Sequence, residues 1–200
     1  LVEFERNEKI LCGNTYRKNF GYSVLSSIYH ELEIDSFLIS RQRGSKYDFS
    51  SNDIMKLLVF SRLLFPASKK KTFEEKERYF EKTNYSLDDV YRCLSFFHKH
   101  SDNLQIWLNS RIKQCYGRDT SLVYYDVTNY YFETDKIDDF KKKGVSKEHR
   151  PNPIVQMGLF IDSNGIPITY KLFPGNTNDS LTFRPNLSRI KKEYGLGKAI

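Results

Sequence analysis

The stretch Leu122-Val123-Tyr124-Tyr125-Asp126-Val127 decides the predicted fold, because the hydrophobic pattern of the chain changes there. Its β-branched and aromatic residues are typical of a strand. Upstream of it, apolar residues recur at helical spacing, whereas downstream the segments are short and bounded by turn residues. We therefore expect a helical region over residues 1–118 and a sheet-containing domain over residues 119–200.

The segments downstream of this strand predict a mixed sheet with flanking helices. A charged loop, about residues 134–153, separates the first strand from a second over about 154–162. Asn164-Gly165 is a strong hairpin signal and predicts a partner strand over 166–173. A helix from about Ser180 and a new strand from Lys198 follow. This order fits the first half of a ribonuclease-H-like domain.

The upstream region predicts four or five helices. Expected inward residues of the first are Leu25, Ile28, Tyr29 and Leu32. The second helix is expected to begin at an N-cap at Asn52 or Asp53 and to end near Pro66. A charged helix is expected near residues 72–81. A capping box over Ser86–Asp89 predicts the start of the next helix, and Ser101-Asp102 predicts the start of a further one.

Composition favours an ordinary globular chain with a polyanionic partner. The chain has 200 residues, 39% hydrophobic and 28% charged, with a formal charge of +7. The excess is spread along the sequence, with +4 in residues 1–120 and +3 in 121–200. A basic balance favours nucleic acid, although a solvated, slightly basic surface explains it equally well. The three cysteines form no Cys-x-x-Cys pair, which argues against a zinc ribbon, and no apolar run is long enough to cross a membrane.

Asp126 is the sharpest candidate for chemistry. We expect it at the end of an apolar strand, where a carboxylate is costly to bury unless it is paired or binds a cation. A structural role, such as capping a turn with Asn129, and a metal-ligand role are both open on the residues alone.

Four separated blocks of the sequence resemble insertion-sequence transposases of the DDE type, and they follow one another along the chain in the order found in that family. The block LVYYDVTNYYFE, residues 122–133, resembles the first catalytic block, and residues 155–179 resemble the segment that follows it. Residues 61–69 and 88–92 are similar to motifs of the family's helical region. The resemblance covers roughly residues 50–200.

The resemblance implies DNA transposition by metal-dependent cleavage and strand transfer. Three acids on a ribonuclease-H-like fold hold two Mg²⁺ (or Mn²⁺) ions in that family, and Asp126 matches the first acid. The second and third are expected beyond Ile200, so we expect the chain alone to be inactive and an Asp to follow within about ten residues. The implied partners are element-end and target DNA and further copies of the chain, without a membrane, in a cytoplasmic, nucleoid-associated protein.

Further residues have two open interpretations each. Thr128, Asn176 and Asp179 are candidate neighbours of the active site, although Asp179 is also a plausible N-cap and Asn176 a turn residue. Asp162 is expected to be a turn residue. The candidate DNA contacts, otherwise solvated charges, are Lys69, Lys70, Lys71, Lys141, Lys142, Lys143, Lys147 and Arg150.

Two other functions fit the same sequence. The first is a non-catalytic DNA-binding or decayed transposase remnant. The second is a nuclease of the same fold that hydrolyses DNA without joining it.

Overall fold

The computed structural model describes residues 18–81, 83–144, 151–178, 190–196 and 198–199. The chain forms two compact units, Leu1–Lys99 and His100–Ile200, which we call the helical unit and the sheet unit. The division falls inside one long helix, α5 (Leu87–Tyr116), which belongs to both units. The expected change from helices to strands near residue 118 is found where α5 gives way to the first strand.

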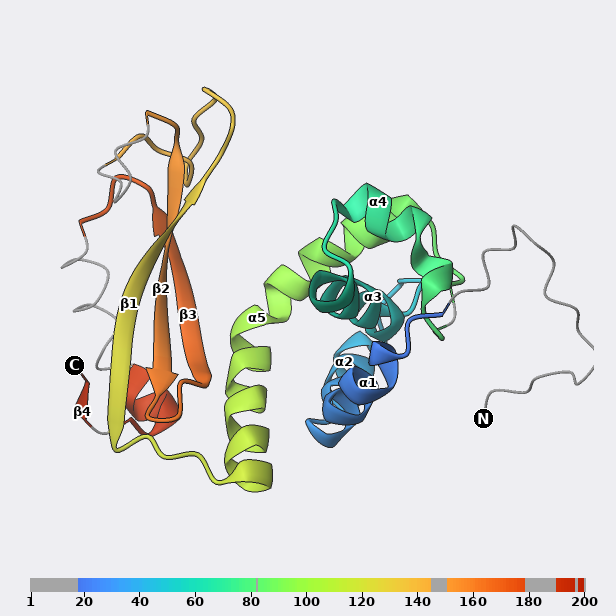
Figure 1. The fold of residues 1–200 in the computed structure, drawn as a ribbon, viewed down its shortest axis with the longest axis horizontal. Coiled ribbons are helices and arrows are strands. Elements are labelled where there is room, and N and C mark those ends of the chain that lie inside the picture. Colours follow the sequence, from blue (N-terminus) through green and yellow to red (C-terminus); the bar gives the residue numbers. More distant parts are fainter. Residues whose placement is uncertain (1–17, 82, 145–150, 179–189, 197, 200) are drawn as a thin grey trace, which may run out of the picture. The chain divides into compact units, whose positions relative to one another are not determined.

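In the part of the helical unit that the structure describes, four α-helices precede α5 (Figure 1). They are α1 (Gly21–Glu31), α2 (Ile34–Gln42), α3 (Ser51–Leu64) and α4 (Lys69–Glu74), followed by a 3₁₀ turn, η1 (Lys76–Arg78). Of the residues predicted to face inward from the first helix, Tyr29 is buried, Leu25 and Leu32 are half-buried, and Ile28 is exposed.

Two predicted helix starts in this unit are wrong by a few residues. Ser50, not Asn52 or Asp53, caps α3, and its hydroxyl accepts a hydrogen bond from the Asp53 N–H at 3.2 Å. The sequence Ser50-Ser51-Asn52-Asp53 offers four residues in a row that favour this position, so pattern alone does not choose between them. The charged helix begins at Lys69 rather than near Thr72, because Ser68 caps it.

The predicted capping box is confirmed. The Ser86 hydroxyl accepts from the Asp89 N–H at 3.1 Å, and the Asp89 carboxylate accepts from the Ser86 N–H at 2.9 Å. The predicted second helix start at Ser101-Asp102 is wrong, because both residues lie inside α5, a single helix of 30 residues. A capping residue is only a weak signal when the apolar period runs on beyond it.

The described residues of the sheet unit form four strands, β1 (Leu122–Tyr131), β2 (Ile154–Asp162), β3 (Pro167–Pro174) and β4 (Lys198–Ala199). They are arranged in the order β3-β2-β1-β4, as the ribbon shows (Figure 1). Both β1–β2 and β2–β3 are antiparallel, whereas β1 and β4 are parallel. The predicted succession of strands along the chain and the mixed α/β class are confirmed. The predicted start of the helix near Ser180 lies outside the described residues, and residues 190–194 are helical.

Alternation along β1 separates a core face from an open face. Val123 and, in part, Tyr125 pack in the core of this unit. The other core members are Phe160, Ile168, Ile190, Tyr194 and Leu196. Because side chains alternate along a strand, Tyr124, Asp126 and Thr128 project from the opposite face.

The β2–β3 hairpin is held by Asp162, as predicted for a turn residue. Its Oδ1 accepts from the N–H groups of Asn164 and Ile166, both at 2.9 Å. Its Oδ2 lies 3.6 Å from Nε of Arg118, and both side chains are almost completely buried. This pair fastens the segment between α5 and β1 to the hairpin.

Candidate functional site

Asp126 lies inside β1 and not at its end, which corrects the prediction. The strand continues to Tyr131 because Thr128, Tyr130 and Tyr131 are also residues that favour strands. Asp126 is exposed, whereas its neighbour Val127 on the core face is buried. The carboxylate therefore stands on the open face of a strand that has a partner on each side, β2 and β4.

The surroundings of Asp126 on the open face are apolar. Across the strands, Asp126 is level with Leu159 of β2, which is level with Tyr170 of β3. Thr128, two residues along, is level with Met157. Paired residues on neighbouring strands have side chains about 5 Å apart, so Leu159 is the cross-strand neighbour of the carboxylate.

Tyrosines stand before and after Asp126 on this face. Tyr124 is 44% exposed and Tyr130 is 46% exposed, unlike the core aromatics. The Tyr130 hydroxyl donates to Sδ of Met157 at 3.5 Å. Both rings therefore keep much of their surface open.

The donor atoms near Asp126 suit a hard cation in kind but not in number. Carboxylate and hydroxyl oxygens are the ligands that Mg²⁺ prefers, and Asp126 and Thr128 supply one of each from the same face. In the described parts of the chain, however, His, Cys, Asp and Glu residues nowhere form a group of three that could hold a metal ion. A divalent ion at Asp126 therefore needs ligands beyond these two side chains.

The basic loop after β1 is fastened to the end of the sheet. Lys142 forms an antiparallel bridge with Ile154, with N–H to O distances of 3.2 and 2.9 Å. Gly144 packs so closely on Gly175 that a Cβ added to Gly144 would lie 1.9 Å from the Gly175 carbonyl oxygen. The Gly175 N–H also donates to the Phe140 carbonyl at 3.0 Å.

We call these contacts of Phe140, Lys142 and Gly144 with Ile154 and Gly175 the clasp of the basic loop. The clasp brings Lys142 and Lys143 next to Asn176, but it does not bring them to Asp126. Asn176 follows the end of β3, and Tyr131, the last residue of β1, lies at the same end of the sheet. Five residues separate Asp126 from Tyr131, which is roughly 16 Å at 3.3 Å per residue. Of the two predicted neighbours among the described residues, Thr128 lies two residues from Asp126 on the same face, and Asn176 lies at the end of the sheet. Lys147, Arg150 and Asp179 lie outside the described residues.

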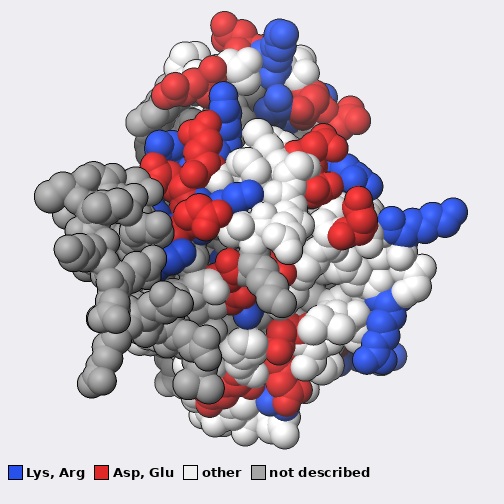
Figure 2. Space-filling view, turned by 90° about the vertical axis from the view of Figure 1, so that its right-hand side faces the viewer, with Lys and Arg blue, Asp and Glu red and all other residues white. Residues whose placement is uncertain are grey.

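The lysines of α4 belong to the helical unit. Lys69, Lys70 and Lys71 are exposed, and Nζ of Lys71 lies 2.8 Å from Oε1 of Glu75. The hydrogen bond to Glu75 raises the pKa of Lys71. Among the described residues on the face in Figure 2, acidic and basic side chains are interspersed around uncharged areas rather than gathered by sign. DNA contact by the α4 lysines therefore stays a prediction.

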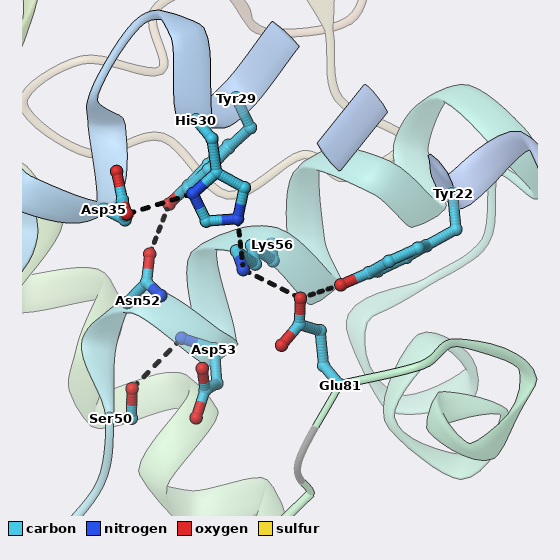
Figure 3. Close-up of polar contacts among 9 residues, drawn as sticks. All are labelled: Tyr22, Tyr29, His30, Asp35, Ser50, Asn52, Asp53, Lys56 and Glu81. Atoms are coloured by element: carbon cyan, nitrogen blue, oxygen red, sulfur yellow. Dashed lines mark hydrogen bonds and ion pairs between the residues drawn. The ribbon is translucent and has the colours of Figure 1, made fainter. Parts of the chain in front are cut away.

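A polar cluster centred on Lys56 was not predicted (Figure 3). The Lys56 side chain is 7% exposed, and its Nζ lies 2.8 Å from Oε1 of Glu81 and 3.3 Å from Nε2 of His30. The Tyr22 hydroxyl donates to the same Glu81 oxygen. Burial lowers the pKa of Lys56 and raises the pKa of Glu81. The cluster joins α1, α3 and the segment after η1.

The hydrogen bonds of the cluster also favour one tautomer of the His30 ring. An ammonium group has no lone pair, so Lys56 donates and Nε2 of His30 accepts. The proton of a neutral ring then lies on Nδ1, which is 3.0 Å from Oδ2 of Asp35 and donates to it. Sequence reasoning missed this arrangement because the partners are 25 and 26 residues apart and no local pattern links them.

No described helix is both long and apolar enough to cross a membrane.

Among the comparisons with known proteins, the chain shows similarity to solved structures but to no family model or curated protein. Three solved structures align at 14% identity: a Mos1 transposase paired-end complex with the left transposon end, a pre-cleavage Mos1 transpososome, and a Mos1 mariner paired-end complex with Mn. Their TM-scores are 0.25, 0.25 and 0.23, and the alignments cover 76%, 76% and 86% of this chain. The same alignments span 50%, 49% and 65% of the matched chains.

Proposed function

We propose that this chain is part of a DDE transposase in which Asp126 is the first catalytic acid. The observation that carries the proposal is the exposed carboxylate in the middle of β1, whose cross-strand neighbour on the open face is Leu159. The resemblance of residues 122–133 to the first catalytic block of these enzymes supports it from the sequence side. A carboxylate that only capped a turn has no reason to lie within a ten-residue strand.

The proposed fold of the sheet unit is ribonuclease-H-like. The order β3-β2-β1-β4, with two antiparallel pairs and then a parallel pair, supports this assignment. β1 is then the central strand that presents the first acid.

The same register predicts where the second acid lies in a longer form of the protein. Val123 is level with Ala199 on the parallel strand β4. The position level with Asp126 is therefore three residues beyond Ala199. We expect an Asp or Glu close to that position, since two metal-binding carboxylates must lie within a few ångströms of a shared ion.

The proposed cofactor is a pair of Mg²⁺ or Mn²⁺ ions. Bound ions of this kind supply an activated oxygen nucleophile and stabilise the leaving oxygen of a phosphodiester. The contribution of this chain is one carboxylate oxygen ligand at Asp126, with the Thr128 hydroxyl beside it.

The proposed substrate is DNA, contacted through its backbone by the clasped basic loop. Lys142 and Lys143 are held by backbone hydrogen bonds and by the Gly144–Gly175 contact, so their main chain is ordered before DNA arrives. Lysines that neutralise phosphates release counterions, which makes affinity fall with salt. The proposed further copies of the chain would assemble on element-end DNA.

The test uses the product of the complete reading frame, DNA carrying the element ends, and Mg²⁺ or Mn²⁺. Cleavage and strand transfer are expected for the natural protein and for Asp139→Asn, a matched exposed acid of the same unit. Asp126→Asn should lower both by at least about 1000-fold, as expected when a metal ligand of the reaction is lost.

Three other outcomes separate the remaining functions. Cleavage that is equal in Asp126→Asn and Asp139→Asn contradicts the assignment of Asp126. DNA binding without cleavage in any form indicates a non-catalytic remnant. Cleavage without strand transfer indicates a nuclease.

A further inference from the structure

The helical unit contains a groove of about 500 Å³. Its lining residues are Phe20, Tyr22, Ser23, Ser26, Ser27, His30 and Phe80. Small-molecule sites in proteins commonly have volumes of roughly 300–1,000 Å³. The groove is therefore large enough for one nucleoside-sized ligand.

Aromatic rings form one part of the lining. The ring centroids of Phe20 and Phe80 are 6.0 Å apart, and those of Tyr22 and Phe80 are 5.4 Å apart. Phe20 makes an edge contact with Phe80 and is 77% exposed, so much of its surface stays open. An aromatic ring that is open on one face can stack on a planar ligand.

Hydroxyl groups form the other part. Ser23, Ser26, Ser27 and His30 recur at i, i+3, i+4 and i+7, so they share one face of α1. The Ser23 hydroxyl donates to the Phe20 carbonyl at 2.9 Å. The side chains of Ser26 and Ser27 make no hydrogen bond with any described residue. Their hydroxyls can both donate and accept, so they can meet either kind of group on a ligand edge.

The buried Lys56–Glu81 pair fixes the polar residues of the groove (Figure 3). Glu81 accepts from the Tyr22 hydroxyl, and Lys56 donates to His30, which in turn donates to Asp35. The Tyr22 and His30 side chains are therefore ordered before any ligand binds. Preorganisation of this kind lowers the entropic cost of binding.

We propose that this groove binds one unstacked nucleobase of single-stranded DNA, which deepens the proposed function and rests on it. Among the described residues, no Lys, Arg, Asp or Glu lines the groove, so its lining complements a neutral ligand rather than a phosphate or a metal ion. A nucleobase is neutral and planar, and its edge carries both donors and acceptors. It thus matches the open aromatic rings and the serine hydroxyls together.

The experiment measures binding of oligodeoxynucleotides that carry 2-aminopurine, a base whose fluorescence falls on stacking, by the purified chain. Saturable quenching is expected with a single strand and much weaker quenching with the same base in a duplex. Phe20→Ala should weaken single-strand binding by roughly 5- to 100-fold, as expected for the loss of a stacking partner. Ser26→Ala/Ser27→Ala should weaken it less and change the preference among bases.

Val24→Ala is the matched control, because Val24 is also on α1 and 63% exposed but does not line the groove. It should bind as the natural chain does. If Phe20→Ala and Val24→Ala bind the 2-aminopurine single strand with equal affinity, the inference is overturned. It is also overturned if an apolar peptide displaces the probe and unlabelled single-stranded DNA does not. If duplex DNA still binds in a salt-dependent way, the proposed function survives that result. If neither form of DNA binds, both fail.

Discussion

The Lys56–Glu81 pair of the helical unit and Asp126 of the sheet unit differ in how far their charged groups are exposed to solvent. In the helical unit, Lys56 and Glu81 are drawn out of solvent and paired among three segments of chain. In the sheet unit, Asp126 stands exposed on the open face of β1. Burial and pairing thus mark the Lys56–Glu81 pair as a contact that holds the helical unit together, whereas the Asp126 carboxylate is exposed to solvent.

The sheet unit also has a buried ion pair, and it differs from the pair in the helical unit. Arg118 and Asp162 are 0% and 1% exposed, more buried than Lys56 and Glu81, but their charged atoms approach only to 3.6 Å. Asp162 owes most of its hydrogen bonds to the backbone of the hairpin. The Lys56 pair is therefore the tighter ion pair of the two, and the Asp162 site is mainly a turn.

The largest effect is expected for Lys56→Met. It leaves the Glu81 carboxylate, which is 18% exposed, without its cation, and removing one partner of a buried pair costs about 3–5 kcal/mol. Urea unfolding measures the loss. Labelling of the buried Cys93 thiol, whose pKa burial raises to about 12, reports opening of the helical unit. Labelling of Cys115 in the sheet unit is the control and should change little.

The double variant Lys56→Met/Glu81→Met shows whether the ion pair itself stabilises the folded chain, or whether the loss in Lys56→Met comes only from leaving the Glu81 charge unpaired. It should recover part of the loss, since replacing both partners removes the unpaired charge. A single Lys56→Met variant as stable as the natural chain would contradict the importance given to this cluster.

A smaller effect is expected for Asp162→Asn, about 1–3 kcal/mol. Asn keeps an oxygen for the Asn164 and Ile166 N–H groups but no longer compensates the buried Arg118. Calorimetric unfolding of the chain measures the change. A loss as large as that of Lys56→Met would mean that the longer ion pair matters as much as the shorter one.

The smallest effect is a pH dependence at the start of α5. Hydrogen bonds from the Ser86 N–H and hydroxyl lower the pKa of Asp89. A carboxyl group with a lowered folded pKa stabilises the fold above its unfolded pKa of about 3.9, and this contribution is lost as the pH falls through the folded value. Asp89→Asn should lower the thermal midpoint by about 1–3 °C at pH 7. The difference from the natural chain should vanish by about pH 2, as circular dichroism melts can show, and a constant difference would contradict a capping role for the Asp89 carboxylate.

The sequence predicted best what depends on a few adjacent residues. The Ser86–Asp89 box, the Asn164-Gly165 hairpin and the alternation of β1 are local, and each is confirmed. The predicted extent of β1 is too short because Thr128 to Tyr131 continue the same preference without a breaker, so Asp126 is inside the strand rather than at its end.

Features that join distant segments could not be predicted. The Lys56 cluster needs α1, α3 and the segment after η1 to come together, and nothing within any one of these segments marks the contact. The clasp of the basic loop depends likewise on Gly144 meeting Gly175, 31 residues away. The position of Asn176 likewise depends on the strand register, which places the end of β3 beside the segment of Lys142 and Gly144.

Locating a bound divalent ion would decide whether Asp126 is a metal ligand. Mn²⁺ broadens the NMR signals of nearby nuclei even when it binds weakly. We expect the strongest broadening at Asp126, Thr128 and Leu159, on the open face of the sheet, and its loss in Asp126→Asn but not in Asp139→Asn. Broadening that centres elsewhere, or that Asp126→Asn leaves unchanged, would contradict the assignment.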